Sequence, residues 1–162
     1  SDIHDNIWAL ADVLRALPEC DALLCLGDLC APFTVAEIRK GYSGPVHLVW
    51  GNNDGDKLLI ARVASEVGEV TIHGDFAELE LGGRLVALTH YPLLAEALAR
   101  GGQYDLVCYG HDHQRSVKPV GATLLVNPGE VMGRFGVSSC AVYDTERREA
   151  RIIEAPRSQA RG

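Results

Sequence analysis

The chain has 162 residues, of which 47% are hydrophobic and 23% are charged, proportions that fit one globular domain with a sizeable core. Its formal net charge of −7 and pI near 5.3 argue against a nucleic-acid backbone as the main partner, because such a partner requires a basic face. No apolar stretch approaches the roughly 18 residues that span a bilayer, and no basic-then-apolar leader is present. We therefore expect a cytoplasmic protein with no membrane partner.

The five cysteines are odd in number, include no C-x-x-C pair and lie mostly within apolar runs. This pattern favours reduced core thiols over a disulfide framework or a zinc knot. The residues concerned are Cys20, Cys25, Cys30, Cys108 and Cys140.

From the start to about residue 110, helical patterns alternate with short apolar runs. Asn6 is a candidate N-cap, and apolar residues then recur at helical spacing as far as Pro18. The runs at 20–27, 45–51 and 104–110 end in glycine and are typical of strands buried on both faces of a parallel sheet. We also predict helices at about 32–41, 57–67 and 92–100, a strand at 70–73 and a hairpin at 76–91.

From residue 116 the pattern changes to short strands with close turns, at about 116–120, 122–126, 136–143 and 149–154. The chain thus reads as α/β first and antiparallel β last, without an internal repeat or a low-complexity linker. We expect a single domain over residues 1–162, in which about 157–162 form a frayed tail.

Polar side chains with metal-binding or acid-base chemistry collect at five places, four of which directly follow a predicted strand. Because ligands bind at the carboxyl ends of strands in open α/β sheets, we expect these clusters to converge. They are Asp2 and His4 in "SDIHDN", Asp28 in "LGDL", Asn52 to Asp54 in "GNND", His90 in "LTHY", and His111 and His113 in "YGHDHQ".

Each cluster taken alone has an ordinary explanation. Glycine, asparagine and aspartate form turns, and a lone histidine is more often a core or surface residue than a ligand. The G-H-x-H pattern is stronger, because two imidazoles on one loop after a buried strand make good metal ligands. Five such clusters in one chain are difficult to assign to turns alone.

The mixture of imidazole, carboxylate and amide, without thiolate, suits a catalytic transition metal rather than a structural zinc or a calcium site. Seven candidate ligands are too many for one such ion, which favours two ions that share a bridging carboxylate. We expect manganese, with nickel, iron, cobalt and zinc as alternatives. Two-metal sites of this kind usually hydrolyse phosphate esters.

The ordered series D-x-H, G-D, G-N-x-D, H and G-H-x-H resembles the motifs of the calcineurin-like metallophosphoesterases, and it spans nearly the whole chain. The short length and the loop "VNPGEV" are most similar to their small prokaryotic phosphodiesterase branch. The resemblance implies a four-layer α/β sandwich in which helices flank two central mixed sheets. It also implies that a hydroxide bridging two metals attacks phosphorus in line with the leaving group.

Carried over position by position, the resemblance assigns every metal ligand. The first metal would be held by Asp2, His4, Asp28 and His113. Asp28 would bridge to the second metal, which Asn52, His90 and His111 would complete. The implied substrate is a small-molecule phosphodiester or a nucleotide-like compound, and a homo-oligomer is compatible with the sequence.

Asn53 departs from the family pattern, because many members carry a histidine there that protonates the leaving oxygen or steadies the phosphoryl group. An amide donates a hydrogen bond but cannot act as a general acid. We therefore expect a preference for diesters whose leaving group needs little protonation. Asp54 is expected either to orient Asn53 or a ligand, or merely to form the turn.

Three further positions differ from the family or adjoin its motifs. Tyr91 follows His90 and is expected either to close one side of the cleft or to pack. Glu130, in the "NPGE" loop, is expected to be a solvated side chain. Cys30 is expected to be a buried thiol rather than a redox-sensitive neighbour of the metals.

Relatives carry an apolar strand immediately before D-x-H, whereas this sequence begins at Ser1. We predict that the natural gene encodes an apolar strand of roughly five to eight residues upstream.

Two other functions share the predicted fold. A phosphomonoesterase or nucleotide pyrophosphatase would use the same metal centre with different pocket walls. A non-catalytic scaffold, like the retromer-coat subunit of this fold, would be expected to have eroded ligands, whereas all seven are present here.

Overall fold

The computed structural model describes residues 1–155, so the predicted frayed tail at 157–162 lies outside the described residues. Four helices are present in this part: α1 (Ile7–Ala16), α2 (Pro32–Gly41), α3 (Lys57–Val67) and α4 (Pro92–Gly101). The strands are β1 (Leu23–Cys25), β2 (Val46–Leu48), β3 (Val70–Ile72), β4 (Phe76–Leu81), β5 (Arg84–Thr89), β6 (Leu106–Cys108), β7 (Ser116–Val120), β8 (Thr123–Asn127), β9 (Ser138–Asp144) and β10 (Glu149–Ala155).

The strands form three sheets. In the first, β1, β2 and β3 are parallel and follow that order. The second has the order β4-β5-β6-β8-β7, in which β5, β6 and β8 are parallel and the antiparallel strands β4 and β7 lie at the edges. The third is the antiparallel pair β9–β10. Central parallel strands with antiparallel edges explain why the central runs are nearly continuously apolar.

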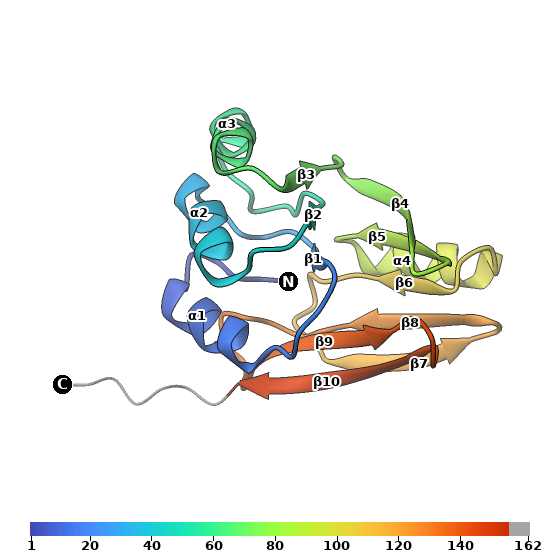
Figure 1. Ribbon diagram of the computed structural model, residues 1–162. Helices are drawn as coiled ribbons and strands as arrows, with labels where there is room; N and C mark the ends of the chain where they lie inside the picture. The colour runs from blue at the N-terminus through green and yellow to red at the C-terminus, as the bar shows by residue number, and fades with distance from the viewer. Residues whose placement is uncertain (156–162) are drawn as a thin grey trace.

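Three hydrophobic cores separate four layers (Figure 1). One core joins α1, α2 and α3 to the first sheet, and a second lies between the two larger sheets. The third joins α4 to the five-stranded sheet. Side chains alternate along β5, so that Val86 and Leu88 enter the second core and Ala87 the third. The predicted α/β sandwich of layered helices and sheets is confirmed.

Local signals determine where the helices begin. The Asn6 side chain accepts a hydrogen bond from Ala9 N at 3.2 Å, which confirms the predicted N-cap of α1. Helices α2 and α4 both begin at a proline. Proline lacks a backbone N–H, but the first N–H groups of a helix have no acceptor within the helix, so no hydrogen bond is lost.

The β9–β10 pair is separate from both larger sheets in the described residues, whereas only two sheets were expected. The first residues of the chain lie between this pair and β1. Asp2 N donates to Gly27 O at 3.1 Å just after β1, and Val131 N, in the loop between β8 and β9, donates to Ser1 O at 3.0 Å. The beginning of the chain is therefore held in the middle of the molecule by bonds on both sides.

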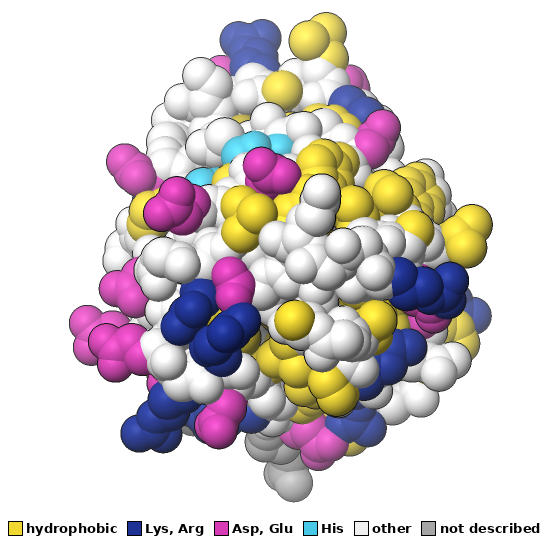
Figure 2. Space-filling view, turned by 90° about the vertical axis from the view of Figure 1, so that its right-hand side faces the viewer, with side chains coloured by type: hydrophobic (Ala, Val, Ile, Leu, Met, Phe, Trp, Pro, Cys, Tyr) yellow, Lys and Arg dark blue, Asp and Glu magenta, His cyan; other side chains and the backbone are white. Residues whose placement is uncertain are grey.

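No helix within residues 1–155 combines the length and the apolar character needed to cross a membrane. The face shown in Figure 2 carries acidic and basic side chains interspersed with apolar ones, without a continuous basic area. The five cysteines are free thiols; Cys25 and Cys108 are buried as predicted for core thiols, whereas Cys20, Cys30 and Cys140 are only half-buried.

Candidate metal centre

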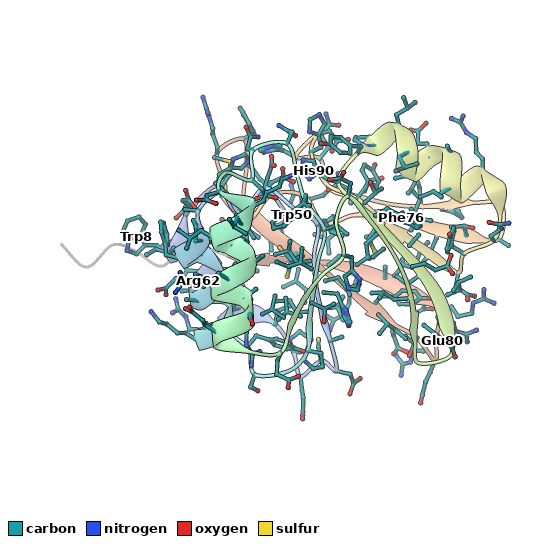
Figure 3. The ribbon with its side chains drawn as sticks, turned by 90° about the horizontal axis from the view of Figure 1, so that it is seen from above. Trp8, Trp50, Arg62, Phe76, Glu80 and His90 are labelled. Carbon is teal, nitrogen blue, oxygen red and sulfur yellow. The ribbon has the colours of Figure 1, made fainter. Side chains whose placement is uncertain are left out.

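The parallel strands bring the predicted clusters to one edge of the two sheets. Asp28 follows β1, Asn52 follows β2, His90 follows β5, and His111 and His113 follow β6. Figure 3 shows His90 between the layer that contains α3 and the N-terminal end of α4. Asp2 and His4, on the segment before α1, complete the group, so that all seven predicted ligands lie together.

Asp2, His4 and His113 form one part of this site. Asp2 Oδ1 lies 3.8 Å from His4 Nε2 and 3.3 Å from His113 Nε2. Among the described residues, neither Asp2 Oδ1 nor His4 Nε2 has a hydrogen-bond partner, although both atoms are buried. Such atoms are rare in folded proteins, and coordination of a cation would satisfy both of them.

Asp28 lies between two histidines. Its Oδ2 atom is 3.5 Å from His4 Nε2 and 3.5 Å from His90 Nε2. His90 is fully buried, and its Nδ1 donates to Leu26 O at 2.7 Å, which leaves Nε2 directed at the carboxylate. A carboxylate in this position can serve two cations at once.

Asn52 completes the other side of the site. Its Oδ1 atom lies 3.1 Å from His90 Nε2 and 2.8 Å from His111 Nδ1. Together with Asp28, these side chains offer one carboxylate, one amide oxygen and two imidazoles. Nitrogen and oxygen donors without thiolate fit a divalent transition metal.

Electrostatics keep the acidic ligands ionised. Burial raises the pKa of Asp28, but the adjacent His90 imidazole and two hydrogen bonds from Asn53 outweigh it and hold this pKa well below its usual range. Burial likewise raises the pKa of Asp2, and the neighbouring His4 and Ser1 lower it to below its ordinary value. Both groups are therefore carboxylates at neutral pH and can ligate a cation.

The backbone of the site is strained. Five of the predicted ligands have positive φ angles between 45° and 76°, a region that side chains other than glycine rarely adopt. They are Asp2, His4, Asp28, His111 and His113. Strain concentrated on these residues is typical of a functional site.

The motif glycines are required by close packing. A Cβ atom on Gly51 would lie 2.5 Å from Asp28 N, and one on Gly110 would lie 2.8 Å from Asp2 Oδ2. Each glycine therefore lets its own loop approach a predicted ligand on another loop.

Asp54 joins two ligand loops. Its Oδ1 atom accepts hydrogen bonds from Leu29 N at 2.8 Å and Cys30 N at 3.0 Å. Its Oδ2 atom accepts from Gly51 N at 2.7 Å and Asp28 N at 3.2 Å. The buried carboxylate thus fixes the loop of Asp28 against the loop that carries Asn52.

Asn53 contacts the predicted bridging residue. Its backbone N donates to Asp28 Oδ1 at 2.8 Å, and its side-chain Nδ2 donates to Asp28 Oδ2 at 2.7 Å. Asn53 is exposed and offers a neutral amide at the edge of the site.

Glu130 is not a solvated side chain, so that expectation is wrong. It is only 3% exposed, and its Oε2 atom accepts a hydrogen bond from His113 Nδ1 at 2.7 Å. The position of Glu130 in the sequence is the signal that could have predicted this contact. The "NPGE" loop follows β8, another parallel strand whose carboxyl end reaches the same edge of the sheet. At that edge, His113 is available as a hydrogen-bond partner for the Glu130 carboxylate, which would otherwise face water.

Cys30 and Tyr91 lie beside the histidines. Cys30 is half-buried rather than fully buried, and its Sγ is 3.5 Å from His4 Nδ1. Burial and nearby carboxylates raise the pKa of this thiol to about 12, which keeps it protonated and poorly reactive. The Tyr91 ring lies 5.3 Å from the His90 ring and 5.8 Å from the His111 ring, between centroids, and is partly exposed. It forms one side of the site.

Residues 1–148 match the family model of the calcineurin-like phosphoesterase superfamily domain. Phosphodiesterase MJ0936 of Methanocaldococcus jannaschii is 28% identical over 158 residues, which cover 94% of this chain and 95% of that protein. Vacuolar protein sorting-associated protein 29 of Schizosaccharomyces pombe is 29% identical over 148 residues, or 90% of this chain and 74% of that protein. A solved archaeal phosphodiesterase superposes with a TM-score of 0.87 at 27% identity and covers 94% of this chain and 95% of its own. The chain belongs to the calcineurin-like phosphoesterase superfamily.

Proposed function

We propose that the protein is a phosphodiesterase that depends on two divalent metal ions. The observation that carries the proposal is the position of Asp28, whose Oδ2 atom is equidistant, at 3.5 Å, from His4 Nε2 and His90 Nε2. A carboxylate between two imidazoles at the edge of parallel strands is the arrangement that a bridged pair of cations requires.

The proposed ligands divide into two sets that share this bridge. The first ion is held by Asp2, His4, Asp28 and His113, and the second by Asp28, Asn52, His90 and His111. Bound divalent ions supply an activated water near neutral pH and neutralise charge on the phosphoryl oxygens. Manganese is the proposed metal, with nickel, iron, cobalt and zinc as alternatives.

The protein's own side chains orient this centre. Leu26 O and Glu130 hold the Nδ1 atoms of His90 and His113, so that Nε2 of each faces the carboxylates. Asp54 fixes the loops that carry Asp28 and Asn52. These contacts keep the ligands in place before any substrate binds.

A diester is the proposed substrate for two reasons. A relative of similar length is named a phosphodiesterase. In addition, Asn53 supplies a neutral amide where many family members have a proton donor, so the substrate's leaving group must depart with little protonation. Aryl diesters satisfy that condition, as do nucleotide-like small-molecule substrates whose leaving group is a phenolate or a phosphate.

The experiment compares bis(4-nitrophenyl) phosphate with 4-nitrophenyl phosphate after metal analysis of the purified protein and addition of Mn(II). We expect about two equivalents of metal and a higher kcat/KM for the diester. Asp28→Asn should abolish both metal binding and turnover. Asp75→Asn is the matched control, because the Asp75 side chain is 73% exposed and lies outside the site.

Each alternative has its own result in this experiment. Faster turnover of the monoester would replace the proposal with a phosphomonoesterase. Absence of both metal and turnover would favour a non-catalytic scaffold, an alternative that the similarity to vacuolar protein sorting-associated protein 29 makes worth testing.

A further inference from the structure

A pocket of about 280 Å³ lies beside the candidate metal centre and shares His113 with it. Its inner wall is formed by His113 and Glu130, and its apolar wall by Phe135 and Val137. Gln114 and Arg115 line the polar side. This volume is just below the roughly 300 Å³ at which pockets for drug-sized ligands begin, so the pocket accommodates one ring system rather than a whole ligand.

Phe135 lines this pocket, and the Arg134 guanidinium lies over its ring. The side chain is 71% exposed, yet its position is fixed from two directions. Its backbone N donates to Glu130 Oε1 at 2.5 Å, and its ring packs edge-on against His113 with 5.3 Å between centroids. Because Glu130 holds the backbone of Phe135 and His113 packs against its ring, the ring loses little conformational freedom when another ring stacks on it.

The charges around the pocket favour a neutral group over a second anion. The Arg115 guanidinium is ion-paired with Glu154, so its charge is already compensated. The Arg134 guanidinium lies over the Phe135 ring at 5.2 Å from the centroid. The buried Glu130 carboxylate at the inner wall disfavours another negative charge. The kind of ligand group that best suits this lining is therefore a flat, uncharged aromatic ring.

We propose that this pocket binds an aromatic group attached to the phosphoryl centre of the substrate, stacked on Phe135. The inference rests on the proposed function, because the shared residue His113 connects the pocket to the metal centre. It narrows the substrate class to esters with a neutral aryl or nucleobase-like group on one side of the phosphorus. Phe135 acts as a specificity residue and takes no part in the chemical step.

The test uses phenylphosphonate and methylphosphonate. In both compounds carbon is bonded directly to phosphorus, so the enzyme has no ester bond to hydrolyse. Their dissociation constants are measured by calorimetry with the Mn(II)-loaded protein. Because stacking on an aromatic side chain contributes roughly tenfold in affinity, wild type should bind phenylphosphonate about ten times more tightly. Phe135→Ala should bring this ratio close to one, and Phe135→Tyr should retain it.

Trp8→Ala is the control for loss of an exposed aromatic side chain. Trp8 is 76% exposed on α1 and lies well away from His90 (Figure 3). This variant should keep the wild-type ratio. Equal binding of the two phosphonates by wild type, or an unchanged ratio in Phe135→Ala, would overturn the inference.

The same measurements separate this inference from the proposed function. If the phosphonates bind equally while bis(4-nitrophenyl) phosphate is hydrolysed, only the aromatic pocket is disproved. If neither phosphonate binds and no diester is hydrolysed, the proposed function fails together with the inference.

Discussion

His113 Nδ1 donates a 2.7 Å hydrogen bond to the buried carboxylate of Glu130, while Nε2 of the same ring lies 3.3 Å from Asp2 Oδ1. The carboxylate therefore selects the tautomer in which Nε2 is free to ligate a metal. This contact ties the loop after β8 to the loop after β6.

Removal of the Glu130 carboxylate should weaken metal binding. In Glu130→Ala, His113 loses the partner that orients it, and a loss of this kind typically costs 10- to 100-fold in metal affinity. Titration of the metal-free protein with Mn(II) by calorimetry measures this change. Glu130→Gln retains an acceptor oxygen and should show a smaller loss. Wild-type affinity in Glu130→Ala would show that the hydrogen bond has no orienting role.

Replacement of Asp54 should destabilise the fold as well as the site. In Asp54→Asn, one oxygen becomes an NH₂ group that faces two backbone N–H donors, which leaves buried donors unpaired. Each such donor costs about 1–3 kcal/mol, so we expect the free energy of unfolding to fall by at least about 2 kcal/mol. Urea denaturation measures it. The exposed control Asp75→Asn should stay within about 0.5 kcal/mol of wild type. Equal stability of the two variants would contradict this account of Asp54.

Acid should destabilise the protein through a second pair of histidines. His47 Nδ1 lies 3.0 Å from His73 Nε2, between β2 and the end of β3. Burial lowers the pKa of both groups below the ordinary value of 6.5, and for His47 the neighbouring His73 adds to the effect. The unfolded chain therefore binds protons that the native state excludes, and stability falls as the pH drops below about 6.5.

The measurement for this pair is the free energy of unfolding of metal-free protein between pH 7 and pH 5. His47→Asn removes one titrating group and relieves its neighbour, so its stability should depend less on pH than that of wild type. The difference between the two proteins isolates the pair from the other histidines. Parallel pH profiles would rule out this contribution.

Introduction of a proton donor at Asn53 should broaden the range of leaving groups. In Asn53→His, kcat/KM for alkyl esters should rise by about 100-fold, near the lower limit for general acid catalysis. A series of diesters with different leaving-group pKa values tests this, with Asn53→Ala as the control that lacks any donor. If wild-type kcat/KM is insensitive to leaving-group pKa and Asn53→His gains nothing on poor leaving groups, the proposed role of this position is wrong.

Metal should stabilise the folded protein. A ligand that binds only the native state at 100 times its Kd adds about 2.7 kcal/mol to the free energy of unfolding. Addition of Mn(II) should therefore raise Tm, and a chelator should reverse the change. His90→Ala should reduce the rise, because one proposed ligand is lost. A Tm that is independent of Mn(II) in wild type would argue against a native metal site.

The sequence predicts the order of the elements well, because their determinants are local. Asn6 caps α1, proline begins α2 and α4, and glycine ends the apolar runs. The convergence of the candidate ligands is also predictable, since each of the clusters at Asp28, Asn52, His90 and His111 follows a strand and parallel strands share one carboxyl edge.

What the sequence does not reveal depends on contacts between distant segments. The sequence favours a solvated Glu130, because nothing near it in the chain shows that His113 is its partner. The sequence does not distinguish an orienting role for Asp54 from a turn, because the four donors to its carboxylate come from two loops.

The long sequence separation between Asp2 and His113 has a consequence for how the protein folds. Segments that are folded on their own hold only local pairs, D-x-H or H-x-H, and neither pair alone encloses a cation. The complete donor set exists only after β1, β2, β5 and β6 have been brought to a common edge. Metal would therefore bind late in folding, after the topology has formed. It would slow unfolding and have little effect on the folding rate.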